Sequence, residues 1–147
     1  MTHFFTTHGL TGLFFASLLA STIIPFGSEW LLIALISQGL DLNLTVATAT
    51  AGNFLGACIT YWLGFTGSSY FIEKIFKIRP ESIARAHTFF DRYGSWSLLF
   101  SWLPIVGDPL CLVSGTLRFS FGRFSVLVLT GKWARYLSVA LITKGLV

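Results

Sequence analysis

The chain has 147 residues, of which 54% are hydrophobic and only 11% are charged, and its formal net charge is +4. A typical soluble domain has about a quarter of its residues charged, so this composition excludes that class and predicts a small membrane protein. The basic residues gather in one connector and at the start of the last apolar segment, which is typical of a membrane topology signal rather than of a nucleic-acid-binding face.

The first apolar segment, about residues 10–40, is interrupted by a short motif that holds Pro25, Gly27 and Glu29. A proline removes a backbone donor from a helix, and a carboxylate inside hydrocarbon is costly and rare without a functional reason. Two half-length helices around this break predict a re-entrant hairpin that enters and leaves the membrane on one face. The alternative is a single kinked helix over the whole segment, which is long enough to span the bilayer.

An uninterrupted and uncharged stretch follows at about residues 44–66, and its length predicts an ordinary transmembrane helix. The helix is expected to begin near Asn43 or Thr45, both of which are common at helix starts. Gly52 and Gly56 form a pair of small residues four apart, which allows another helix to approach closely. This face is predicted to pack tightly, with a hairpin as its candidate partner.

The connector at about residues 67–93 is rich in charge and alternates basic, acidic and apolar residues. This pattern predicts two short amphipathic helices at the membrane interface, separated at Arg79 and Pro80. The excess of basic residues places the connector in the cytoplasm. Its charged face is interpreted as solvated, the alternative being a regulatory binding surface.

The second broken segment, about residues 94–117, holds Pro104, Gly107, Asp108 and Pro109 at its centre. By the same reasoning it predicts a second re-entrant hairpin, which opens toward the cytoplasm because arginines follow it.

The last apolar segment predicts a transmembrane helix at about residues 120–145, with its C-terminal end outside. The predicted fold class is an all-α membrane protein with two opposed re-entrant helical hairpins, two spanning helices and an interfacial amphipathic segment. Broken helices in an inverted arrangement are typical of transporters.

The candidate site consists of the ionisable residues inside apolar sequence, with one more at the end of the connector: Glu29, Asp108, Lys132, Arg135 and Arg92. Lys132 and Arg135 are three residues apart, so they share a helix face and can address the same cavity. Two interpretations are compatible with each other: structural ion pairs that hold the hairpin tips to the last helix, or a substrate or proton site. Asn53 is expected to hydrogen-bond a neighbouring helix.

Several runs of the chain carry a family resemblance: Phe89–Gly94, Trp102–Leu110, Ser114–Gly115, Pro25–Glu29 and Gly52–Gly64. Together with their surroundings they extend over about residues 10–140 and resemble the DedA-like superfamily, also called VTT or SNARE-associated Golgi proteins. Gly107–Pro109 and Gly131–Tyr136 are most similar to its small YqaA branch. The resemblance implies a single membrane domain over residues 1–147.

The resemblance also implies a multi-pass protein of the bacterial inner (plasma) membrane with paired re-entrant loops. For function, the resemblance to the superfamily implies proton-coupled transport or lipid translocation, including the flipping of polyprenyl phosphate carriers. Bacterial members usually have arginines around the second-loop proline, whereas here Ser101 and Trp102 precede Pro104 and Asp108 stands in the region of the second arginine. Arginine is the side chain suited to phosphate, so that role does not carry over to these positions.

The predicted function is therefore a proton-coupled small transporter or lipid translocase with a polar site at mid-membrane. The alternative is a non-catalytic membrane-integrity or assembly factor. No enzymatic activity is expected, because the sequence holds no nucleophile–base spacing, no zinc-protease motif and no phosphate-binding loop. An intramembrane aspartyl protease built on Glu29 and Asp108 would need surrounding motifs that this sequence does not contain.

No cofactor or metal is expected, because the three histidines stand far apart. Cys58 and Cys111 are interpreted as small buried thiols rather than as a disulfide. The expected partners are membrane lipids, with protons and a lipid or small-molecule substrate as the candidate cargo. A homo-oligomer is compatible with the sequence, and no nucleic-acid partner is expected.

Overall fold

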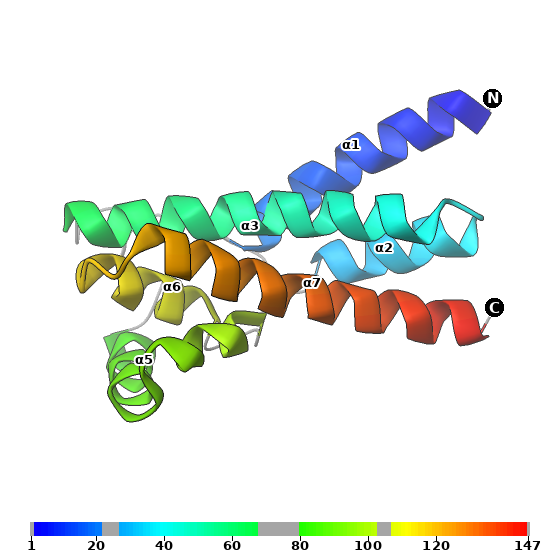
Figure 1. The fold of residues 1–147 in the computed structure, drawn as a ribbon. Helices are drawn as coiled ribbons and strands as arrows, with labels where there is room; N and C mark the ends of the chain where they lie inside the picture. Colours follow the sequence, from blue (N-terminus) through cyan, green and yellow to red (C-terminus); the bar gives the residue numbers. More distant parts are fainter. Residues whose placement is uncertain (1, 22–26, 68–79, 103–106, 147) are drawn as a thin grey trace.

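The computed structural model describes residues 2–21, 27–67, 80–102 and 107–146, and within these ranges the regular elements are helices (Figure 1). Pro25 and Pro104 lie outside the described residues. The helices, in chain order, are α1 (Thr2–Ala20), α2 (Gly27–Ser37), α3 (Leu42–Thr66), α5 (Pro80–Tyr93), the 3-10 helix η1 (Gly94–Trp102), α6 (Gly107–Thr116) and α7 (Phe121–Leu146).

Helices α3 and α7 are the long elements, with 25 and 26 residues, and they lie side by side in opposite directions (Figure 1). At 1.5 Å per residue each is roughly 38 Å long, which exceeds the roughly 30 Å hydrocarbon core of a bilayer. Only 44% and 33% of the residues in their most apolar windows are buried. Much of the remaining surface is apolar, including Trp62, Val126 and Ile142, and a soluble monomer rarely exposes such a surface. Both helices are candidate membrane spans.

The shorter helices form two pairs at opposite ends of the molecule. In the first pair, α1 packs against α2, and a Cβ on Gly9 near the start of α1 would lie 2.8 Å from Leu35 near the end of α2. In the second pair, a Cβ on Gly107 at the start of α6 would meet the carbonyl oxygen of Ser101 at the end of η1. The contact between Gly9 and Leu35 shows that α1 and α2 run in opposite directions. Figure 1 shows α2 near the end with the two termini, and α6 and α5 at the other end.

Glycines allow the short helices to approach α3 closely. A Cβ on Gly56 would lie 2.6 Å from the Cβ of Ser21 and 2.8 Å from the carbonyl oxygen of Leu18, and a Cβ on Gly52 would meet the α1 backbone one turn earlier. Farther along α3, Gly64 contacts the backbone of α6 in the same way, and Gly115 of α6 contacts that of α3. These crossings leave no room for a side chain, and small residues are the usual solution in membrane helix pairs.

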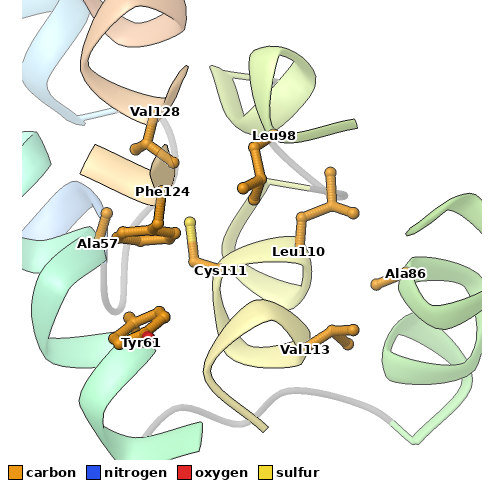
Figure 2. Packing of buried hydrophobic residues seen from close by; sticks show 9 residues of the cluster. All are labelled: Ala57, Tyr61, Ala86, Leu98, Leu110, Cys111, Val113, Phe124 and Val128. Carbon is orange, nitrogen blue, oxygen red and sulfur yellow. The ribbon is translucent and has the colours of Figure 1, made fainter. Parts of the chain in front are cut away.

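Two separate hydrophobic clusters fill the two ends of the bundle. Figure 2 shows one of them, where Phe124 and Cys111 meet between α3, α6 and α7. Its buried members are Ala57, Tyr61, Ala86, Leu98, Leu110, Cys111, Val113, Phe124 and Val128. The cluster at the other end consists of Leu13, Leu32, Leu35, Ile36, Val46, Ala49, Tyr136 and Ala140. Each long helix contributes to both clusters and must therefore pass through the layer between them.

Helix α5 places its apolar side on the protein and its charged side outward. Ala86 is fully buried, and Ile83 and Phe90 pack against the same cluster. Arg85 and Arg92 are exposed on the opposite side. The amphipathic pattern of this half of the connector thus produces packing on α6 as well as a charged surface, while residues 68–79 lie outside the described residues.

Two element starts differ from the sequence predictions, and the start of α3 agrees with them. Helix α3 begins at Leu42, next to Asn43, and the Asp41 carboxylate caps it by accepting a hydrogen bond from the Leu44 backbone N–H at 2.9 Å. Helix α1 begins at Thr2 rather than near residue 10. The second broken segment opens as the 3-10 helix η1 instead of an α-helix. The apolar pattern identified these segments but did not fix where or how each helix starts.

Candidate functional site

A polar layer separates the two hydrophobic clusters at mid-length of the long helices. Asn53 lies in the middle of α3 with 5% of its surface exposed, and Lys132 lies in the middle of α7 with 4% exposed. The ends of the short helices reach the same layer and contribute the buried serines Ser17, Ser21 and Ser28. Burying a charged lysine among serines and an asparagine costs desolvation free energy. A lysine at this position is therefore expected to have a hydrogen-bonding partner or a functional role.

One part of this layer joins α2 to α7 by a direct ion pair. The Arg135 guanidinium donates a hydrogen bond to the Glu29 carboxylate, and both side chains are largely shielded. Beside them, the hydroxyls of Ser28 and Tyr136 share a hydrogen bond of 2.8 Å. Glu29 also lies in the first turn of α2, where a negative charge is favoured by the helix dipole. We call these four residues the α2–α7 clasp.

The other part of the layer brings together four helices around Asp108, which lies in the first turn of α6. Its carboxylate accepts a hydrogen bond from the hydroxyl of Ser21, the residue directly after α1, at 3.5 Å, which is long for such a bond. The Lys132 ammonium interacts electrostatically with Asp108 but donates its hydrogen bond to the Asn53 side-chain oxygen. The Asn53 amide in turn donates to the Ser17 carbonyl at 3.2 Å. We call these five residues the Asp108 cluster.

The two basic residues of α7 thus have different partners, although they share a helix face. The sequence predicted that Lys132 and Arg135 could address one cavity; in the structure Lys132 donates to Asn53 of α3, and Arg135 pairs with Glu29 of α2. Of the two structural ion pairs considered, the described residues contain the one between Glu29 and Arg135. Asp108 and Lys132 do not form such a direct pair within the described residues.

The remaining candidate residues lie at the edge of the layer or away from it. Gly107 packs on η1, and Pro109 is buried directly after Asp108 in α6. Gly27 begins α2. Arg92 is exposed on α5, with its guanidinium 5.6 Å from the ring centroid of Tyr93, and is not part of the layer.

Sequence reasoning missed the hydroxyl groups of the layer: Ser17, Ser21, Ser28 and Tyr136. Ser17 lies near the end of α1 and Ser21 directly after it, four residues apart, which places both on one face of an apolar stretch. This spacing is the sequence pattern from which Ser17 and Ser21 could have been identified. Cys58 and Cys111 are free thiols, as predicted; Cys111 is buried and Cys58 is half-buried.

Comparisons with known proteins give consistent matches along the chain. The family model described as the VTT domain matches residues 24–144. Inner membrane protein YqaA of Escherichia coli is 37% identical over 137 residues, which cover 91% of this chain and 90% of the relative. An uncharacterized protein of Haemophilus influenzae is 31% identical over 150 aligned positions, covering 95% and 90%.

A more distant relative carries a functional name. Undecaprenyl phosphate transporter A of Staphylococcus aureus is 24% identical over 143 residues, which cover 89% of this chain and 70% of the relative. No solved structure matches the chain.

Proposed function

The chain belongs to the VTT domain family, and from this premise we propose that it is an inner-membrane, proton-coupled small transporter or lipid translocase. The observation that carries the proposal is the polar layer, in which two acids and two bases meet between two apolar clusters. Ionisable residues at such a depth mark substrate or ion pathways in membrane proteins.

The membrane arrangement that we propose has two opposed re-entrant hairpins. The pair α1 and α2 enters from the outer face, and the pair η1 and α6 enters from the cytoplasmic face. The contact between Ser21, directly after α1, and Asp108 of α6 supports a meeting of the two tips near the bilayer centre. Exposed arginines at the end with α5, including Arg85, Arg118 and Arg123, support a cytoplasmic location for that end.

Proton exchange in this scheme belongs to Asp108. Its contacts are a long hydrogen bond from Ser21 and the nearby charge of Lys132, whose own hydrogen bond goes to Asn53. A carboxylate without a direct ion pair can gain or lose a proton without the rupture of a salt bridge. The Glu29 carboxylate is held by Arg135 and serves to fix the first hairpin to α7.

A lipid cargo is supported by the outer surface of the bundle. The exposed sides of α3 and α7 are apolar, so a lipid can reach the hairpins laterally from the bilayer. The name of the Staphylococcus aureus relative points to a lipid carrier as well. The loop arginines of the superfamily are replaced here, and we therefore propose a lipid or small molecule without naming its headgroup.

Reconstitution into liposomes tests the proposed function. Asp108→Asn keeps the shape of the side chain and removes its charge, so we expect it to insert normally and to lose proton-coupled translocation. Glu29→Gln is measured in parallel, and Asp91→Asn on the exposed side of α5 is the matched control. If Asp108→Asn and Glu29→Gln both keep full activity, the acids are structural and the proposal is wrong.

Cysteine-accessibility mapping tests the hairpins. Positions on either side of residues 103–106 are expected to react from the same membrane face, and so are positions on either side of residues 22–26. Labelling from opposite faces would mean a spanning segment instead of a hairpin. Reporter fusions after Arg85 and after Val147 should report opposite compartments, and a common compartment would reject the proposed topology.

The second candidate, a non-catalytic membrane-integrity or assembly factor, is favoured by the tight glycine crossings and by the Glu29–Arg135 pair, which suit a rigid scaffold. This alternative predicts no flux in liposomes. It also predicts that variants lose cellular function only in proportion to their loss of folded protein.

A further inference from the structure

An open groove lies on the surface of α7 beside its first turn, at the end of the molecule where α5 and α6 also lie (Figure 1). Its volume is about 350 Å³, and the described residues that line it are Gly122, Arg123, Val126 and Leu127. Gly122 and Val126 are four residues apart, as are Arg123 and Leu127, so the groove runs along the helix axis. One end of the groove therefore carries a cation, and the other end is apolar.

The Arg123 side chain at the head of this groove is available to a ligand. It is exposed, and within the described ranges its guanidinium forms no ion pair and no hydrogen bond. Arg85 and Arg118, which are also exposed, add positive charge to the same end of the molecule. An unpaired arginine beside an apolar groove suits an amphiphile with an anionic head, because the guanidinium group binds phosphate through paired hydrogen bonds.

The depth of the groove matches the polar and apolar levels of a lipid. Lys132 lies in the polar layer, and Arg123 precedes it by nine residues of the same helix, which is about 14 Å at 1.5 Å per residue. Half the thickness of a hydrocarbon core is roughly 15 Å. With the polar layer near the bilayer centre, Arg123 reaches the level of the lipid phosphates, and Val126 and Leu127 lie at the level of the acyl chains.

We propose that this groove binds an anionic phospholipid of the cytoplasmic leaflet, with its phosphate on Arg123 and the upper part of one acyl chain along Val126 and Leu127. The lipid is a resident of this surface rather than the cargo, so the inference rests on the proposed membrane arrangement and not on transport. Small-molecule sites have volumes of about 300–1,000 Å³, so this groove takes the first part of a chain and leaves the rest in the bilayer. Basic sites on the cytoplasmic side of membrane proteins are known to bind anionic headgroups.

The charge at the groove favours a lipid over a second copy of the chain. A two-fold contact centred on this face would bring two Arg123 side chains together, and like charges repel strongly where water is excluded. A lipid phosphate instead supplies the negative charge that the described lining residues lack.

Gly122 offers a way to close the groove without disturbing the fold. A Cβ on Gly122 would meet no closer atom of the surrounding protein than the Ser120 hydroxyl oxygen, at 4.0 Å. A leucine at this position is therefore accommodated, and it occupies the space of the groove. Gly145 in the last turn of the same helix has nothing within 4 Å of such a Cβ, so Gly145→Leu is the matched control.

Thermal unfolding of the purified full chain in detergent tests the inference, with dioleoylphosphatidylglycerol compared against dioleoylphosphatidylcholine at equal concentrations. The anionic phosphatidylglycerol should raise the wild-type midpoint, because a ligand that binds the folded state stabilises it. Phosphatidylcholine, which has a phosphate but no net charge, should raise it less. Arg123→Gln should need about tenfold more phosphatidylglycerol for the same rise, as expected for the loss of a hydrogen bond to a charged group.

Three further variants separate a defined site from general attraction to the basic end. Gly122→Leu should keep the wild-type midpoint without lipid and lose the response to phosphatidylglycerol, whereas Gly145→Leu should keep that response. Arg85→Gln removes one positive charge from the exposed side of α5 and should also keep it. Native mass spectrometry should detect bound phosphatidylglycerol on the wild type and on both control variants, and much less on the two groove variants.

The inference is wrong if both lipids raise the midpoint equally or if Arg123→Gln responds like the wild type. It is also wrong if Arg85→Gln loses as much of the response as Arg123→Gln, which would mean diffuse attraction to the whole basic end. A change of oligomeric size in Gly122→Leu with an unchanged lipid response would contradict it as well, because a second copy would then cover the groove.

Asp108→Asn separates this inference from the proposed function. The variant should lose proton flux in liposomes and keep the full response to phosphatidylglycerol, because the substitution lies in the polar layer. A wild type that responds to phosphatidylglycerol but shows no flux would overturn the proposed function alone. Flux without any response to phosphatidylglycerol would overturn the anionic-lipid site alone.

Discussion

The α2–α7 clasp and the Asp108 cluster contain the same kinds of charge on one face of α7, but they hold those charges differently. In the clasp, Arg135 bonds Glu29 directly, and a hydrogen bond of 2.8 Å between Ser28 and Tyr136 lies beside the pair. In the Asp108 cluster, the acid has a hydrogen bond of 3.5 Å, and Lys132 is bonded to the neutral Asn53.

We propose that this difference separates a structural contact, the α2–α7 clasp, from a functional site, the Asp108 cluster. An ion pair that is bonded directly and reinforced must be broken before either member can exchange a proton or meet a ligand, which is unfavourable at low dielectric. Charges that are neighbours without a direct bond can change their state at lower cost. The comparison teaches that equal residue types on one helix face need not have equal roles, because the helix that approaches each residue decides its role.

Arg135→Ala should have the largest effect on stability, because it leaves Glu29 shielded from water without its cation. Loss of one partner of a buried pair destabilises by about 3 kcal/mol or more. The measurement is the yield of folded protein and its unfolding midpoint in detergent. Adding Glu29→Gln to Arg135→Ala should recover most of the lost stability. If the double variant is as unstable as Arg135→Ala alone, the Glu29–Arg135 pair does not anchor α2 to α7.

Asn53→Leu should have the next largest effect, because it removes the acceptor of the Lys132 ammonium. A hydrogen bond to a charged group contributes about 2 kcal/mol, so the unfolding free energy should fall by that amount. Asn43→Leu is the matched control, since Asn43 is exposed at the start of the same helix. Equal effects at the two positions would contradict a role for Asn53 in orienting Lys132.

Ser28→Ala should have a smaller effect on stability and little effect on flux. It removes the hydrogen bond to Tyr136 in the clasp, and interhelical hydrogen bonds within membranes contribute about 0.6 kcal/mol on average. Unfolding midpoints and liposome flux are measured on the same preparations. A large loss of flux per folded molecule would mean that the α2–α7 clasp takes part in transport.

Ser21→Ala should have the smallest effect on stability, because its bond to Asp108 is long. In contrast to Ser28→Ala, it should change the pH dependence of flux, since it removes a hydrogen-bond donor from the carboxylate that we propose to exchange protons. An unchanged pH profile would argue against Asp108 as the exchanging group.

Much of the architecture could be predicted from the sequence, because hydrocarbon imposes strong constraints on it. Long apolar stretches predicted the candidate membrane spans α3 and α7, the first uncharged and the second with Lys132 and Arg135 inside it. The spacing of Gly52 and Gly56 predicted a packing face, and in the structure α1 packs closely against both glycines. Family membership followed from motifs that extend along most of the chain.

The pairing within the polar layer could not be predicted in the same way. Spacing placed Lys132 and Arg135 on one face of a helix, but it carries no information on which short helix approaches each of them. Lys132 donates to Asn53, whose amide is in turn bonded to the Ser17 carbonyl of α1, and these contacts depend on how separate helices pack. The start of α1 at Thr2 and the 3-10 form of η1 were missed because the apolar pattern is insensitive to both.

The most direct test of the account is proton flux per folded molecule in liposomes, measured side by side for Asp108→Asn and Glu29→Gln. The account predicts that Asp108→Asn falls to the level of protein-free liposomes while its folded yield is retained. Glu29→Gln should lose folded protein but keep most of its flux per folded molecule. The reverse pattern, or equal flux in the two variants, would contradict the assignment of Asp108 to the functional site and of Glu29 to the structural contact.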